Sequence, residues 1–163
     1  MSKDGLIALT GPSVQPEWID YNGHMNVAYY LLAFDKVTDL LWDHMGIGLD
    51  YVKRTNRSTF TLECHMNFLR EVKLGDPLEF TFQLLDHDRK KFHFFGRMYH
   101  GTQNYVAATM EWMTLHVDLG IRRGADMDDP TFARFAAVKA AHAALTRPPE
   151  AGRVIAMGQR RAG

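Results

Sequence analysis

The stretch DYNGHMNVAYYLLAFDKVTDLLWDHM, residues 20–45, decides the fold because it joins a polar loop to a long apolar helix. After Asn26 the apolar residues recur at steps of three and four, which is the spacing of one helix face. They are Val27, Tyr30, Leu31, Phe34, Val37, Leu41 and Met45, widened by Tyr29, Leu32, Ala33 and Leu40. We predict a helix with Asn26 as N-cap and Gly46 at its end. Such an apolar helix must be enclosed by other structure.

Four alternating stretches follow the helix and predict four strands. The first comes after a turn-rich segment at 46–58. Every second residue from Phe60 to Phe68 is apolar, which predicts a strand with one buried face. Cys64 belongs to this face, so we expect it to be a packed, unreactive side chain. The other three stretches are 78–84, 91–99 and 105–118. The short turns between these three are typical of antiparallel hairpins in a meandering sheet.

The two ends of the chain complete one predicted domain over residues 1–147. Residues 6–19 form an extended arm that Pro12 and Pro16 interrupt. A C-terminal helix is predicted over about 130–147, capped by Asp129, and 148–163 is expected to be a flexible tail. One strand, one apolar helix and four antiparallel strands make an α+β domain. The helix is buried most economically if the sheet curls around it.

The composition of this 163-residue chain excludes several classes of partner. Lysine plus arginine equals aspartate plus glutamate at 19 each, so we expect neither a nucleic acid nor a membrane surface as partner. A single cysteine excludes an internal disulfide and favours the cytoplasm, as does the lack of a signal peptide. The eight histidines lack metal-ligand spacing and no glycine-rich phosphate loop occurs, so we expect no metal and no cofactor.

The densest run of functional residue types lies just before the helix. Asp20, Asn22, His24 and Asn26 surround Gly23, which lets the backbone approach a ligand closely. The first turn of a helix offers unpaired N–H groups and a positive dipole end, and both stabilise an oxyanion. A carboxylate beside them can attack a carbonyl or activate water. Turn and cap chemistry alone would explain the same string, so the residues by themselves leave both interpretations open.

A family resemblance decides between these interpretations. PEWIDYNGHMNVAYYLLAFDKVTDLL, residues 16–41, resembles the D-x-x-G-H-[MV]-N-x-x-x-Y signature of the 4-hydroxybenzoyl-CoA thioesterase-like branch of the hotdog superfamily. NFLREVKLGDPLEF, residues 67–80, is similar to the second element of that family. The resemblance covers about residues 8–119. It implies a hotdog fold, an acyl-CoA substrate hydrolysed to free acid and CoA, and a homodimer, with a tetramer left open.

The same resemblance implies roles for individual residues. Asp20 matches the catalytic aspartate, which acts as nucleophile or as general base toward water. Backbone amides near Asn26 and Val27 would polarise the thioester carbonyl. His24 would position water or bond to Asp20, and a packing or capping role is its alternative. The other positions expected to line the substrate pocket are Asn22, Gly23 and Val27.

Two further groups are candidates for substrate binding. Glu63 and His65 share one face of the first strand after the helix, where they reach the pocket, a partner subunit or solvent. Arg89, Lys90 and Lys91 form the one compact basic run in the body of the fold. These cations would hold the phosphates of CoA, or they form a solvated hairpin tip.

The acyl group is the least determined feature. The chain is similar to thioesterases, some fused to carnitine dehydrogenases, that hydrolyse betainyl-CoA, which makes betainyl-CoA the leading candidate. Aromatic residues could form a cage for its quaternary ammonium by cation–π attraction. Those near the motif and on the predicted strands are Trp18, Tyr21, Tyr29, Tyr30, Trp42 and Trp112.

Two other functions remain as alternatives. A hotdog hydratase or dehydratase carries D-x-N-P-x-H, which Asp20, Asn22 and His24 resemble. Here glycine replaces the proline and the histidine comes one residue early, which would misplace the imidazole. A non-catalytic acyl-CoA-binding module would keep the pocket but would not need Asp20.

Overall fold

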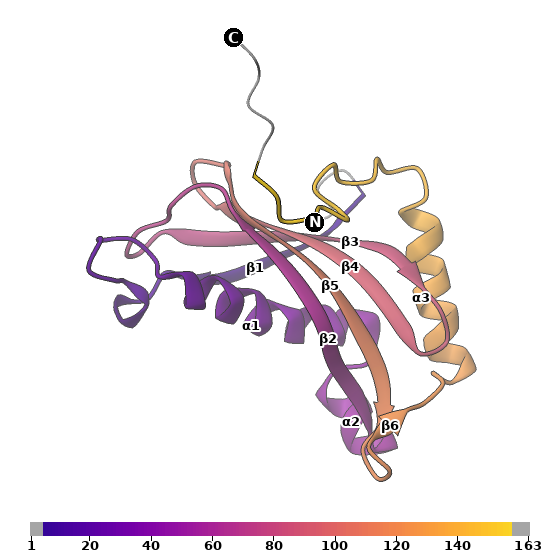
Figure 1. Cartoon of the computed structure of the whole chain (residues 1–163). Helices are drawn as coiled ribbons and strands as arrows, with labels where there is room; N and C mark the ends of the chain where they lie inside the picture. The colour runs from indigo at the N-terminus through magenta and orange to yellow at the C-terminus, as the bar shows by residue number, and fades with distance from the viewer. Residues whose placement is uncertain (1–4, 158–163) are drawn as a thin grey trace.

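A computed structural model describes residues 5–157, in which one curved antiparallel sheet wraps around a long helix (Figure 1). The elements are β1 (Ile7–Ser13), the 3-10 turn η1 (Pro16–Trp18), α1 (Val27–Met45), α2 (Leu49–Thr55), β2 (Arg57–Phe68), β3 (Pro77–His87), β4 (Lys91–His100), β5 (Val106–Asp118), β6 (Arg123–Gly124) and α3 (Asp129–Ala141). The strand order is β1-β3-β4-β5-β2, with β6 paired to β5. The predicted α+β hotdog fold is confirmed.

Helix α1 forms the centre of the core, with the ends that the sequence predicts. The Asn26 side chain accepts a hydrogen bond from the Ala28 N–H at 3.0 Å, and Gly46 ends the helix at φ 76°. Phe34 is fully buried and packs edge-on against Phe80 of β3 with ring centroids 5.1 Å apart. Gly96 of β4 faces Phe34, and a Cβ at that position would lie 3.0 Å from its ring. The glycine therefore lets the helix approach the sheet closely.

The sheet topology differs from a simple meander at β2. Strands β3, β4 and β5 follow one another as hairpins, as predicted, but β2 pairs with β5 and not with β3. The connection from β2 to β3 is anchored beneath the start of α1, where the Met25 N–H donates to the Val72 carbonyl at 2.9 Å. Val72 is fully buried. This anchor carries the chain across to the other side of the sheet, so β2 becomes an edge strand.

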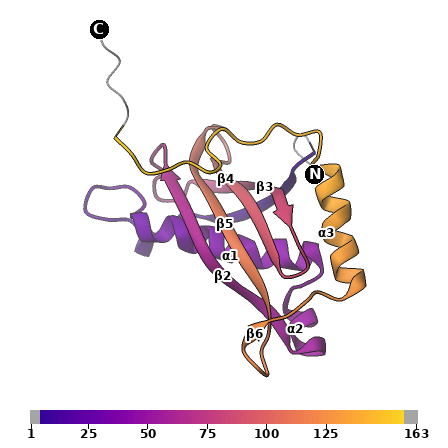
Figure 2. The same ribbon diagram turned by 45° about the vertical axis from the view of Figure 1, so that its right-hand side comes forward.

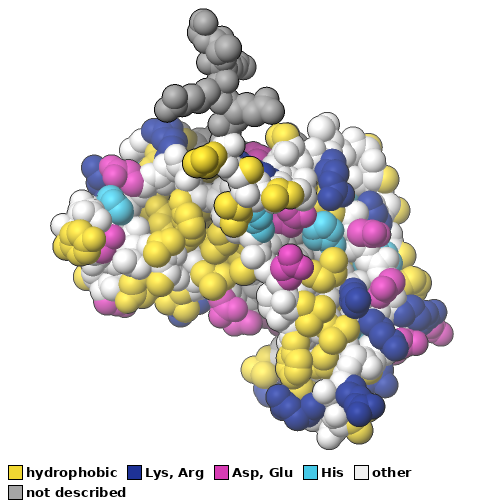
Figure 3. Space-filling model, viewed as in Figure 1, with side chains coloured by type: hydrophobic (Ala, Val, Ile, Leu, Met, Phe, Trp, Pro, Cys, Tyr) yellow, Lys and Arg dark blue, Asp and Glu magenta, His cyan; other side chains and the backbone are white. Residues whose placement is uncertain are grey.

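A β-bulge in β2 breaks the predicted alternation of its side chains. The pairing register shifts between Thr61 and Glu63, and each unpaired residue moves the following side chains to the other face. Cys64 lies opposite Trp112 on the face toward α1 but is exposed, so the expected packing of this cysteine is wrong. The reason is that no further strand of the described chain covers the β2 edge. Figure 3, in the view of Figure 1, shows hydrophobic side chains gathered over α1 and along β2.

A short helix, α2, occupies the segment that the sequence predicts as turns. Gly48 precedes it in an extended conformation and Asn56 ends it in the left-handed region, at φ 54°. Its buried Tyr51 hydroxyl lies 3.0 Å from Nε2 of His116 on β5. This tertiary contact explains why the helix forms although its seven residues carry little helical periodicity.

The C-terminal part of the described chain packs against the sheet. Asp128, and not Asp129, caps α3 by accepting the Thr131 N–H at 2.9 Å, and the helix ends at Ala141, six residues earlier than predicted. Beyond it, the chain runs back from α3 along the end of the sheet (Figure 2). The backbone N–H of Gly152 donates to Glu111 of β5 at 2.7 Å. The predicted tail thus contacts the sheet through residues 150–153, whereas Ile155 and Met157 are exposed, and 158–163 lie outside the described residues. No helix within 5–157 is long and apolar enough to cross a membrane.

Candidate active site

The loop before α1 is a small, closed hairpin. The backbone N–H of Asp20 donates to the His24 carbonyl at 3.1 Å, and Ile19 and Met25 form an isolated β-bridge. Gly23 closes the turn at φ 80°, a conformation that side chains disfavour, and its N–H donates to the Asp20 carbonyl at 3.0 Å. Met25 is almost fully buried beneath the loop. These contacts hold the Asp20 backbone in a fixed position beside the helix start.

The Asp20 carboxylate has one occupied and one free oxygen. Its Oδ1 atom accepts the Asn22 N–H at 2.8 Å, an Asx turn that fixes the side-chain direction. Its Oδ2 atom has no hydrogen-bond partner among residues 5–157. The side chain is only 13% exposed, so this oxygen is aimed into a restricted space and not into open solvent.

One backbone amide at the start of α1 is free to bind an oxygen. The Asn26 N–H, expected to share this role, already donates to the Trp18 carbonyl at 2.8 Å. The Ala28 N–H donates to the Asn26 side chain. This leaves the Val27 N–H, at the first helical position, without a partner in the described part of the chain. It lies at the positive end of a 19-residue helix.

These groups share a cavity of about 390 Å³. Asp20, His24, Met25, Asn26, Val27 and Tyr30 line one side, and Phe68, Leu69, Arg70 and Glu71 line the other. Asn22 and Gly23 do not line it and act through the loop backbone instead. The sequence prediction missed the second wall, although the aromatic-basic pair in NFLREVKLGDPLEF was the signal that could have located it. We call this cavity the Asp20 pocket.

His24 lies beside Asp20 without a direct hydrogen bond to it. Its Nδ1 atom is 3.9 Å from Asp20 Oδ1 and 3.3 Å from the Met25 carbonyl. With Nδ1 toward that carbonyl, the other ring nitrogen is available to water or substrate. A third of the side chain is exposed.

Glu63 and His65 belong to a different cavity. They line a hollow of about 340 Å³ together with His93, Glu111 and Arg153. His65 lies opposite Glu111, one residue out of phase with Cys64 and Trp112, so it is on the sheet face turned away from α1. The structure therefore separates this pair from the Asp20 pocket within one chain.

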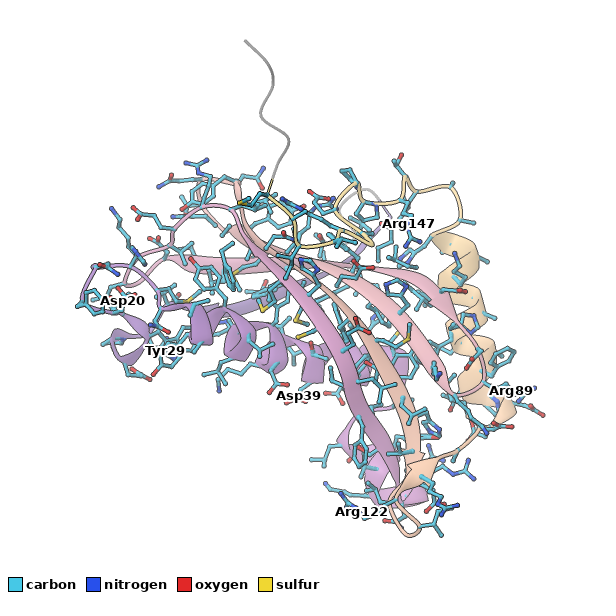
Figure 4. All side chains as sticks on the ribbon, in the orientation of Figure 1. Asp20, Tyr29, Asp39, Arg89, Arg122 and Arg147 are labelled. Atoms are coloured by element: carbon cyan, nitrogen blue, oxygen red, sulfur yellow. The ribbon has the colours of Figure 1, made fainter. Side chains whose placement is uncertain are left out.

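The basic run at 89–91 lies far from Asp20. Figure 4 shows Arg89 and Asp20 at opposite ends of the molecule. Arg89 pairs with Asp129 at 2.8 Å, and Lys90 pairs with Asp126 at 3.5 Å. Lys91 lines a small separate hollow of about 140 Å³. None of the three reaches the Asp20 pocket of its own chain.

The histidines of the described chain form no metal site. No group of three or more His, Cys, Asp or Glu within residues 5–157 is arranged to hold an ion. His142 is buried, and its Nδ1 atom accepts the Leu84 N–H at 3.0 Å. Burial lowers the pKa of His142 and that of His116, so both rings serve the core in their neutral form.

Comparison with known proteins agrees with this geometry. A family model described as thioesterase-like superfamily matches residues 14–136. The betainyl-CoA thioesterase of Pseudomonas aeruginosa is 44% identical over 144 residues, which are 88% of this chain and 91% of that protein. The L-carnitine dehydrogenase/betainyl-CoA thioesterase of Rhizobium meliloti is 36% identical over 99% of this chain, which spans 32% of that longer protein.

Solved structures show the same arrangement. A putative thioesterase from Pseudomonas putida superimposes with a TM-score of 0.78 at 35% identity, covering 93% of this chain and 98% of that one. A Staphylococcus aureus protein in complex with CoA gives a TM-score of 0.85 at 28% identity, with 94% and 96% covered. The chain therefore belongs to the thioesterase-like superfamily and is a thioester hydrolase, as its D-x-x-G-H-M-N motif predicts.

Proposed function

We propose that this chain hydrolyses betainyl-CoA to betaine and CoA, with Asp20 as the catalytic carboxylate. The observation that supports this best is the shared pocket of a free carboxylate oxygen and a free helix-start amide, Asp20 Oδ2 and Val27 N–H. The name of the Pseudomonas aeruginosa relative supports the acyl group. The single cysteine fits a cytoplasmic location. CoA enters as part of the substrate.

The roles of the residues follow from this geometry. The thioester carbonyl oxygen accepts the Val27 N–H, and the helix dipole stabilises the negative charge that develops there. Asp20 Oδ2 then acts in one of two ways. It attacks the carbonyl carbon and expels the CoA thiolate, and water hydrolyses the resulting anhydride, or it takes a proton from the water that attacks. The free nitrogen of His24 positions this water.

The hydratase alternative fits the site less well. That chemistry needs an aspartate and a histidine that face each other across the substrate as acid and base. Here the His24 ring is turned toward the Met25 carbonyl and lies on the same loop as Asp20. Both groups therefore approach a bound thioester from one side.

We further propose that two copies pair along β2. Eleven β2 residues pair with β5, and the other edge of this 12-residue strand is free among the described residues. An uncovered edge strand is a template for another chain. Apolar side chains are exposed beside it: Val27 (56%), Leu31 (45%) and Leu62 (52%). A second copy would bury them and enclose the open side of α1.

Thiol release from a panel of acyl-CoAs tests the proposed activity. We expect betainyl-CoA to be hydrolysed with a kcat/KM at least about 10-fold above that of acetyl-CoA, a gap of about 1.4 kcal/mol. Crotonyl-CoA serves as the control for the hydratase, because water addition to it releases no thiol. Hydration of crotonyl-CoA without thiol release, or tight binding of every member without turnover, would contradict the proposal.

Asp20→Asn tests the carboxylate. Asparagine keeps an oxygen that accepts the Asn22 N–H, so the loop should fold unchanged, but it cannot attack or accept a proton. We expect kcat to fall about 100-fold or more, with the melting temperature and substrate binding nearly unchanged. Stopped-flow thiol release and thermal denaturation measure the two effects. Wild-type turnover in this variant would exclude Asp20 from the chemistry.

Val27→Pro tests the amide without removing a side-chain function. Proline is well tolerated at the first helical position, and Asn26 already has the extended conformation, φ −65° and ψ 147°, that a residue before proline prefers. The variant should fold but lose the N–H that holds the carbonyl oxygen. We expect kcat to fall about 10²–10³-fold, the usual cost of one oxyanion donor. Val27→Ala keeps the amide and is the matched control. Equal activity of the two variants would refute the role of this N–H.

Leu62→Lys tests the pairing along β2. The residue lies at the bulge and is half-exposed in one chain, so a charge there should break the interface. Light scattering should give twice 18.6 kDa for the wild type and 18.6 kDa for the variant. Ile121→Lys, at an exposed site in the turn between β5 and β6, should remain a dimer. A wild type of one-chain mass would refute the proposal.

A further inference from the structure

Two aromatic rings form the wall of the Asp20 pocket next to the helix start. Tyr30 of α1 and Phe68 of β2 meet edge to face, with ring centroids 5.2 Å apart and an interplanar angle of 76°. Tyr30 is buried, whereas Phe68 is 49% exposed and keeps part of its surface open to the pocket. Trp42 and Trp112, also candidates for an ammonium cage by sequence, line other hollows.

The charges around this pocket favour a cation. Asp20 and Glu71 both line it. Arg70 is the one lysine or arginine among its described lining residues, and its guanidinium lies over the Tyr105 ring at 3.7 Å from the centroid. Lys73 pairs with Glu71 at 3.3 Å, but both side chains are more than half exposed, so solvent screens this pair.

The effect of these carboxylates extends to the Tyr30 ring. Burial raises the pKa of the Tyr30 hydroxyl above its usual value, and the negative charges of Glu71 and Asp20 raise it further. The two carboxylates therefore act on the position of this ring through their charge, and the same charge attracts a cation placed beside the ring.

Covalent geometry places the cation of a betainyl group within this pocket. One methylene separates its ammonium nitrogen from the carbonyl carbon, a distance of about 2.5 Å for ordinary C–N and C–C bonds. When the carbonyl oxygen accepts the Val27 N–H, the ammonium nitrogen therefore stays within a few ångströms of the first turn of α1. Tyr30 follows Val27 by three residues and is therefore its neighbour on the same side of α1.

We propose that Tyr30 and Phe68, assisted by the negative charge of Glu71, select acyl groups that carry a quaternary ammonium next to the carbonyl. The aromatic faces attract the cation and its methyl groups, and the carboxylate compensates its charge without a rigid ion pair. This inference rests on the proposed thioesterase activity at Asp20. It assigns the acyl selectivity to residues that the catalytic step does not use.

A pair of isosteric substrates tests this selection. 3,3-Dimethylbutyryl-CoA replaces the ammonium nitrogen of betainyl-CoA with carbon, so the two differ in charge but hardly in shape. The quantity measured is the ratio of kcat/KM for betainyl-CoA to kcat/KM for the neutral isostere. We expect the wild type to favour betainyl-CoA and Phe68→Leu to lower the ratio about 5- to 20-fold. Phe68→Tyr keeps an aromatic face and should preserve the ratio.

A control on the same strand separates charge selection from packing. Phe60→Leu makes the same change in β2 outside the Asp20 pocket and should leave the ratio at the wild-type value. If Phe68→Leu slows both substrates equally, Phe68 only packs and the inference is overturned. If the wild type hydrolyses both substrates equally well, charge selection fails while the thioesterase stands. If the wild type hydrolyses neither, the proposed function itself is refuted.

Discussion

The hydrogen bonds of Asn26 are the constraint on which the site depends. Its backbone N–H donates to the Trp18 carbonyl and its side chain accepts the Ala28 N–H, so the residue is held from both sides. The first bond ties the helix start to η1, and the second begins the helix. Together they leave the N–H of Val27, a residue that lines the pocket, without a partner among the described residues. One residue thus sets where α1 begins and which N–H is available for an oxyanion.

Asp20 has both a structural and a chemical function. Its backbone closes the hairpin with His24, its Oδ1 atom fixes the Asx turn, and only Oδ2 remains for the substrate. A carboxylate that is held by its own loop loses little conformational entropy when it reacts. The loop geometry therefore depends on the Asp20 side chain, on the positive φ of Gly23 and on backbone groups of residues 22 and 24.

The sequence predicted those features that depend on local chemistry. The ends of α1 followed from the cap signals of Asn26 and Gly46, and the motif located the Asp20 loop. The position of β2 at the sheet edge and its bulge at Leu62 could not be predicted, because strand pairing is decided by distant parts of the chain. For the same reason Phe68 and Glu71 were missed, since they reach the pocket only through that topology.

The open edge of the fold and the position of the pocket have a common cause. The sheet encloses α1 on one side only, because β2 is the last strand and its free edge leaves Val27 and Leu31 exposed. The Asp20 pocket opens along this same edge, between the helix start and the end of β2. Covering the apolar surface with a second copy would therefore also narrow the entrance to the pocket. In such a pair the burial that stabilises the assembly would exclude water from the charged reaction, which strengthens every electrostatic contact there.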